Sequence, residues 1–135
     1  MTILSTSSHL FKKVTLKAYS KSIDYTPRLV TWHLTFKDDF PTQRAQKLAL
    51  SGSIPFLNWE PQHLDDENAI HLRDISQGVW DDYLETMADE IKEYQYPLFI
   101  NFAPLPNIST QPWSISQLDE DATLYKDTYQ YLVTF

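Results

Sequence analysis

Cysteine is absent from the 135 residues of this chain, and glycine occurs only twice, at Gly52 and Gly78. Without cysteine, disulfides, thiolate metal sites and cysteine nucleophiles are all excluded, although the cellular compartment stays open. Two isolated glycines cannot build the glycine-rich loop that cradles a phosphate group. Mononucleotide-binding and dinucleotide-binding folds therefore lose their main support.

Long apolar runs and an excess of positive charge are also missing. The chain has no run of 18 or more apolar residues, and its first residues, MTILSTSSHLFKK, lack the apolar core of a signal peptide. Eighteen acidic residues against eleven basic ones give a net charge of −7, which repels a phosphate backbone. We therefore expect a soluble chain, cytoplasmic by default, that binds neither nucleic acid nor membrane.

Motifs for metal binding and nucleophilic catalysis do not occur either. The chain has four histidines, His9, His33, His63 and His71, and they show no i, i+4 pairing or other spacing typical of a metal site. Only His33 lies near an expected strand end. A Ser-His-Asp system would need a nucleophile elbow, and no such motif is found. The sequence therefore predicts no metal and no cofactor.

Aromatic residues, in contrast, are abundant. Four Trp, eight Tyr and seven Phe make up 14% of a chain whose apolar content of 42% is typical of a folded domain. Composition favours a core of large side chains. The alternative is sugar binding, because the apolar faces of sugars stack on aromatic rings while their hydroxyls bind polar neighbours.

Hydrophobic periodicity divides the chain into alternating strands and helices. Four strands are expected. Alternation predicts one at 10–19, β-branched and aromatic residues predict one at 28–36, and short apolar runs predict those at 54–59 and 98–102. Helices are expected after Pro41, ending at Ser51-Gly52, along 80–94, and from about Asp121 to the C-terminus. Polar connectors are expected at 20–27 and 62–78, and an irregular segment contains Pro112-Trp113.

This alternation predicts an α/β fold with a parallel sheet. About three βα units follow the N-terminal strand, and they fit either a doubly wound sheet or part of a (βα) barrel. In a barrel, functional residues lie where strands end and βα loops begin. Those ends are Trp32 to Phe36, Asn58-Trp59-Glu60 and Asn101 to Asn107.

Several segments, taken in order, resemble glycoside hydrolase family 26, the β-mannanase group with a TIM-barrel fold. They are IPFLNWEP, LRDISQGVWDDYLETMADEIKEYQYPLFINF, the Pro-Trp that follows, and the earlier PRLVTWHLTFKDDFP. The resemblance covers about Thr26 to Phe135. It implies a partial TIM barrel in 28–135, preceded by a divergent strand and connector in 1–27. The substrate class that it implies is β-mannan or a related β-linked polysaccharide.

The same comparison shows what this chain lacks. The family's general acid/base is a His-Glu pair, and aligned without gaps these positions fall on Pro104 and Leu105. The strand of the family's nucleophile would lie beyond Phe135. Glycoside cleavage needs two carboxyl groups, about 5–5.5 Å apart for retention and about 6.5–9.5 Å for inversion. Because Glu60 is the only acid at an expected strand end, we expect no catalytic residues.

Five residues are candidates for sugar binding, each with a structural alternative. The rings of Trp32, Trp59 and Trp113 form a stacking surface at the barrel mouth or pack beneath the loops. Glu60 lines a cleft or caps the following loop. By resemblance, Asn107 binds a sugar hydroxyl, although it equally suits a turn. The acidic connector residues are expected to be solvated side chains, namely Asp65, Asp66 and Glu67.

The leading hypothesis is therefore a truncated, catalytically inactive β-mannanase-like domain. The alternative is a non-catalytic carbohydrate-binding or protein-interaction module that uses the same barrel mouth. A part-barrel exposes strand edges, which three arrangements would cover. They are a homo-oligomer, a partner chain that completes the barrel, or a small remnant domain in which the strand at 10–19 shields one edge.

Overall fold

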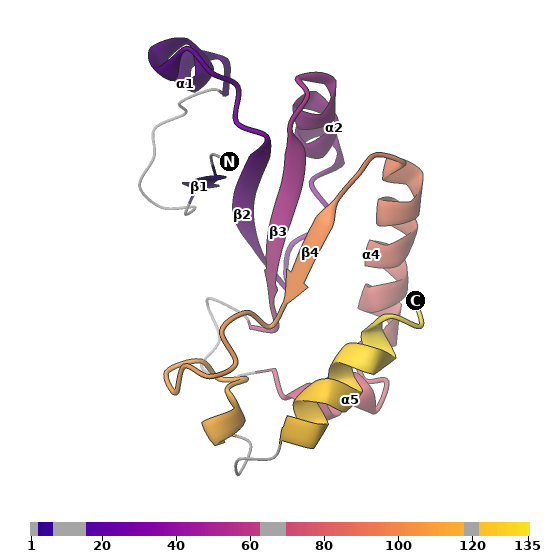
Figure 1. The fold of residues 1–135 in the computed structure, drawn as a ribbon. Coiled ribbons are helices and arrows are strands. Elements are labelled where there is room, and N and C mark those ends of the chain that lie inside the picture. The colour runs from indigo at the N-terminus through magenta and orange to yellow at the C-terminus, as the bar shows by residue number, and fades with distance from the viewer. Residues whose placement is uncertain (1–2, 7–15, 63–69, 118–121) are drawn as a thin grey trace.

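The computed structural model describes residues 3–6, 16–62, 70–117 and 122–135. Four strands form one sheet in the order β1-β2-β3-β4, and every neighbouring pair is parallel (Figure 1). The strands are β1 (Ile3–Thr6), β2 (Leu29–Thr35), β3 (Ile54–Glu60) and β4 (Phe99–Phe102). The helices are α1 (Leu16–Ile23), α2 (Thr42–Leu50), α3 (Leu72–Ser76), α4 (Asp81–Tyr94) and α5 (Ala122–Leu132), with one 3-10 turn at Ile115–Gln117.

The expected α/β class and the parallel sheet are confirmed. Three of the four expected strands match β2, β3 and β4 to within a residue or two at each end. The helix after Pro41 is α2, and Gly52 ends it with a φ of 80°, which glycine adopts without a steric penalty. The apolar stripe of α4 faces the core, where Leu84, Met87 and Tyr94 are buried.

Two expectations about local structure are wrong. The strand expected at 10–19 is replaced over residues 16–19 by α1, while residues 10–15 lie outside the described part of the chain. Leu16, Tyr19 and Ile23 are spaced by three and four, so helical periodicity fits this segment as well as alternation does. The first strand lies instead at Ile3–Thr6. The connector at 62–78 contains the short helix α3, whose Leu72 and Ile75 are buried.

The two faces of the sheet differ in character. On one face, side chains from β2, β3 and β4 pack with the helices to form the core, which includes Val30, Trp32, Leu34, Leu57, Trp59 and Phe102. Figure 1 shows α2 and α4 running along this side of the sheet. The alternate positions point to the other face. We call this second face the polar face and define it by His33, Phe56, Asn58, Glu60, Phe99 and Asn101.

The strand order bears on the choice between sheet types. A doubly wound sheet reverses its strand order at a switch point, whereas the strands of a (βα) barrel follow one another in sequence. The described sheet runs from β1 to β4 without a reversal. This order agrees with a segment of a barrel, but four strands do not by themselves form a closed one.

An aromatic cluster joins the sheet to α4. The ring of Phe36 lies 5.2 Å from that of Trp59, 5.5 Å from that of Trp80 and 4.9 Å from that of Tyr83, measured between ring centroids. The Tyr83 hydroxyl accepts a hydrogen bond from Trp59 Nε1 (3.2 Å) and faces the carbonyl oxygens of Thr35 (3.1 Å) and Asp38 (3.0 Å). This cluster fixes the end of β2 against α4.

Burial of Tyr83 predicts a loss of stability in alkali. Desolvation raises the pKa of Tyr83 and also that of Tyr125, because burial disfavours the phenolate. Above about pH 10 the unfolded chain releases these protons while the folded chain keeps them, so the free energy of unfolding falls as pH rises. For Tyr83 the slope is at most about 1.4 kcal/mol per pH unit, whereas for Tyr125, which is more open to solvent, screening reduces the effect and only its direction is expected. Urea denaturation between pH 8 and pH 11 measures it, and a flat profile would contradict the burial of these hydroxyls.

Candidate functional site

Polar side chains gather on the polar face near the carboxyl ends of β2, β3 and β4. The strand register places His33 beside Asn58, and Asn58 beside Asn101, so all three point to the same face. Glu60 follows two residues after Asn58 and therefore points the same way. In parallel α/β sheets, ligands bind at the carboxyl ends of the strands, so this group is the candidate site.

Both oxygens of the Glu60 carboxylate have partners. His33 Nδ1 lies 2.6 Å from Oε1, and Gln62 Nε2 donates to Oε2 at 2.6 Å. The Glu60 side chain is largely covered, whereas the His33 side chain is exposed. Because Nδ1 faces Glu60, Nε2 is the ring nitrogen that can meet a ligand hydroxyl. The carboxylate is thus held in one orientation and in turn orients the imidazole.

An asparagine pair lies beside this group. Asn101 Nδ2 donates to Asn58 Oδ1 at 3.0 Å, across neighbouring strands. Each side-chain amide has donor and acceptor capacity beyond this one bond, because an amide offers two N–H groups and an oxygen with two lone pairs. The pair is half-buried and can therefore bind a polar ligand on its solvent side.

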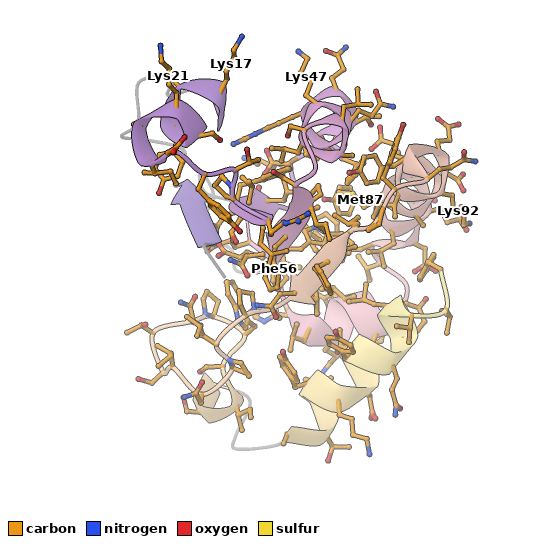
Figure 2. The ribbon with its side chains drawn as sticks, turned by 45° about the horizontal axis from the view of Figure 1, so that its top comes forward. Lys17, Lys21, Lys47, Phe56, Met87 and Lys92 are labelled. Carbon is orange, nitrogen blue, oxygen red and sulfur yellow. The ribbon has the colours of Figure 1, made fainter. Side chains whose placement is uncertain are left out.

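Two phenylalanines form an apolar floor toward the amino ends of the same strands. The rings of Phe56 and Phe99 lie 6.1 Å apart between centroids, and Phe99 is 51% exposed. Figure 2 shows Phe56 near the middle of the sheet, while Lys47 and Lys92 project outward from the helices. The polar face therefore changes from apolar to polar along the strand direction.

The three tryptophans predicted to stack on sugar are instead packed inside the protein. Trp32, Trp59 and Trp113 are 2%, 8% and 1% exposed. Trp32 and Trp59 alternate with His33, Asn58 and Glu60, so their rings point to the helix-covered face. Since none of the three presents a ring face to solvent, the structure supports the packing alternative. The sequence located the strand ends but did not decide which face each side chain occupies.

The loop after β4 contains the other predicted positions. Ala103 and Leu105 have φ values of 45° and 59°, which non-glycine residues seldom adopt. Leu105, which the resemblance aligns with the family's acid/base, is exposed. Asn107 is also exposed, five residues beyond the end of β4, and its role in binding stays a prediction.

Contacts from later in the chain hold this loop. Trp113 Nε1 donates to the Pro104 carbonyl oxygen at 2.7 Å, and Tyr125 Oη donates to that of Ala103 at 3.0 Å. The Ala103 N–H donates to the Trp59 carbonyl oxygen at 2.9 Å. The backbone of the loop is therefore fixed by buried partners, and its exposed side chains take no part in holding it.

Sequence reasoning located Glu60 but not its neighbours. The sequence places His33 near a strand end but assigns it no role, and it gives no separate reason to select Asn58, Gln62 or Asn101 as binding residues. One signal could have found three of them, because His33, Asn58 and Asn101 are a histidine and two asparagines within strands that are mostly apolar. The predicted acidic residues Asp65, Asp66 and Glu67 lie outside the described residues, as does His63.

The group offers hydrogen bonding rather than acid/base pairing. Glu60 is its one carboxylate, and each oxygen of that carboxylate has one protein partner and further lone pairs that can accept from a ligand. Asp38, in the loop after β2, is bonded through Oδ2 to the N–H and hydroxyl of Thr35, which stabilises the turn.

Among the described residues, no three His, Cys, Asp or Glu side chains are placed to hold a metal ion. None of the described helices is both long and apolar enough to cross a bilayer.

Comparison with models of known protein families finds no match to this chain, and comparison with characterised proteins finds none either. The similarity to glycoside hydrolase family 26 therefore depends on the motifs and their order alone.

Proposed function

We propose that this chain binds β-linked oligosaccharide without hydrolysing it, as a domain similar to part of a family 26 glycoside hydrolase barrel. One observation carries the proposal. His33, Asn58, Glu60 and Asn101 converge at the carboxyl ends of neighbouring parallel strands, on one face of the sheet.

The chemistry of this group suits a sugar. Carboxylate, amide and imidazole groups are planar, and together they present both donors and acceptors to the hydroxyls of a pyranose ring. Glu60 and its partners are already hydrogen-bonded, so little side-chain entropy is lost when a ligand binds. The apolar floor of Phe56 and Phe99 adjoins the polar group and can exclude water from one side of it.

The absence of hydrolysis follows from the same group. Cleavage of the usual kind places two carboxyl groups on opposite sides of the scissile bond, and one of them must give up a proton. Leucine at position 105 can neither donate nor accept a proton. We therefore expect no release of reducing sugar from β-mannan, and turnover that depends on Glu60 would overturn this part of the proposal.

Calorimetric titration with manno-oligosaccharides of two to six sugars tests binding. Glu60→Gln and Asn58→Ala should each weaken binding roughly tenfold. Each substitution removes or misplaces hydrogen bonds to the sugar, and for each variant the lost bonds contribute about 1.4 kcal/mol in total to the binding free energy. Glu93→Gln is the matched control, because it removes one negative charge from an exposed position on α4. If none of the sugars releases or absorbs heat at millimolar concentration, the binding proposal is wrong.

A second candidate function is a protein-interaction module. The observation in its favour is the exposure of Phe99 and Ile100 on β4. Such a module would bind another chain through the strand edge and would leave the polar group without a sugar ligand. Normal stability together with no response to oligosaccharide would favour it.

A further inference from the structure

The strand β4 has the composition of a central strand but lies at an end of the described sheet. Its sequence, FINF, contains neither charge nor proline, and Phe99 and Ile100 are exposed on opposite faces. Natural proteins commonly protect edge strands with charge, proline or a bulge. None of these devices is present in β4.

The outer edge of β4 offers backbone groups for pairing. The Ala103 N–H donates to the Trp59 carbonyl oxygen, so by alternation the N–H groups of Phe99 and Asn101 also point toward β3. Ile100 and Phe102 therefore direct their backbone N–H and C=O groups away from β3, where the Phe102 carbonyl oxygen accepts a hydrogen bond from Tyr125 Oη (3.3 Å). The remaining groups form a short parallel template on the outer side of the strand.

An apolar pocket of about 220 Å³ lies next to this edge on the helix-covered side. The pocket is lined by Ile100, Trp59, α4 and the end of α5, and Lys92 is its only charged lining residue. Phe99 is exposed on the polar face of the same strand. At Phe99 and Ile100, both faces of β4 are thus apolar, which is the environment expected of a strand with neighbours on both sides.

The other end of the described sheet matches β4 in length and in its lack of charge. β1 is also four residues long, and its sequence, ILST, is uncharged. All four strands are parallel and follow in sequence, which is half of the eight-stranded arrangement of a (βα)8 barrel. In such a barrel, the next strand pairs in parallel with the outer edge of β4. A strand like β1, taken from a second copy of the chain, could fill that place.

Charge distinguishes the two ends of the sheet. Figure 1 shows α1 on the β1 side of the sheet and α4 on the β4 side. The helix α1 carries Lys17 and Lys21 with no acidic residue, and both lysines project away from the sheet in Figure 2. The helix α4 contains six acidic residues and one lysine. Placing the β1 end of one copy at the β4 end of another therefore brings opposite charges together.

We propose that two copies of this chain associate about a twofold axis, with β4 of each copy paired in parallel with β1 of the other. The product is a closed sheet of eight parallel strands with the helices outside. Phe56 and Phe99 become interior residues, and the polar groups of both copies lie at the same mouth. This inference concerns assembly, and it does not depend on whether the chain binds sugar.

Light scattering coupled to size-exclusion chromatography tests the assembly. The expected mass is twice the 15.8 kDa of one chain. Phe99→Lys should produce a folded monomer, because the lysine is tolerated at a half-exposed position but not inside a closed barrel. Leu50→Lys, at a more exposed apolar position on α2, is the matched control and should remain a dimer. Circular dichroism checks that both variants fold.

Cross-linking tests the geometry, and the absence of native cysteine makes it specific. In one sheet, β1 and β4 are separated by two strands, a distance of about 14 Å at roughly 4.8 Å per step. The register places Thr6 level with Ile100 and on the same face, so a bis-maleimide shorter than this should link the double variant Thr6→Cys, Ile100→Cys only between copies. A monomeric wild-type chain would overturn the proposal. A dimer that is unaffected by Phe99→Lys, or one that yields no cross-link, would also overturn it.

Discussion

Trp113→Ala is expected to lower the free energy of unfolding by about 3–5 kcal/mol, the range for removing a large buried aromatic side chain. The ring is 1% exposed and belongs to the main core. Its Nε1 donates to the Pro104 carbonyl oxygen at 2.7 Å, so the substitution also leaves a buried acceptor without its partner. Urea denaturation followed by circular dichroism measures the change.

Trp113→Phe separates packing from hydrogen bonding. It keeps most of the ring volume and should cost less, about 1–3 kcal/mol, because mainly the Pro104 contact is lost. If Trp113→Ala instead left stability within 1 kcal/mol of wild type but weakened oligosaccharide binding, the ring would be a ligand contact. The packing role described for it would then be incorrect.

Phe36→Ala is expected to have an effect of similar size, again about 3–5 kcal/mol. Phe36 is buried at the centre of the aromatic cluster and lies within 5.5 Å, between centroids, of Trp59, Trp80 and Tyr83. Ring pairs in such geometries contribute about 0.5–1.5 kcal/mol beyond the area that they bury. Removing one ring therefore weakens the contact between β2 and α4 as well as leaving a cavity.

Phe36→Leu serves as the conservative comparison. Leucine fills part of the space but cannot reproduce the edge-on contact with Trp80 or the tilted contacts with Trp59 and Tyr83, so we expect an intermediate loss of stability. The measurement is again urea denaturation, with near-ultraviolet circular dichroism to follow the tryptophans. Equal stability of wild type and Phe36→Ala would show that the cluster does not hold α4 on the sheet.

Local patterns in the sequence predicted most elements of the fold. The strands β2 and β3 are rich in β-branched and aromatic residues, and the stripe of α4 has one clear period, so their type and approximate bounds could be predicted. The segment around α1 was misread because short apolar spacings suit both helix and strand. The order of the strands could not be predicted from any single element, since it depends on contacts between segments far apart in the chain.

The candidate site could be predicted only in part. Glu60 was identifiable as an acid at a strand end, but its partners His33 and Gln62 come from another strand and from the following loop. Trp32 and Trp59 are predicted in the correct strands and Trp113 in the irregular segment after β4, and each has two alternative roles. The choice between these alternatives depends on which face of the sheet is covered, and that is a property of the whole fold.

The loop after β4 has a consequence for how this domain can change. Its backbone is held by Trp113, Tyr125 and the end of β3, whereas the side chains at positions 105 and 107 face solvent. Substitutions at those two positions therefore leave the supports of the loop intact. The scaffold can acquire or lose chemistry at this place without refolding, which makes the loop a suitable starting point for directed evolution of a new binding or catalytic group.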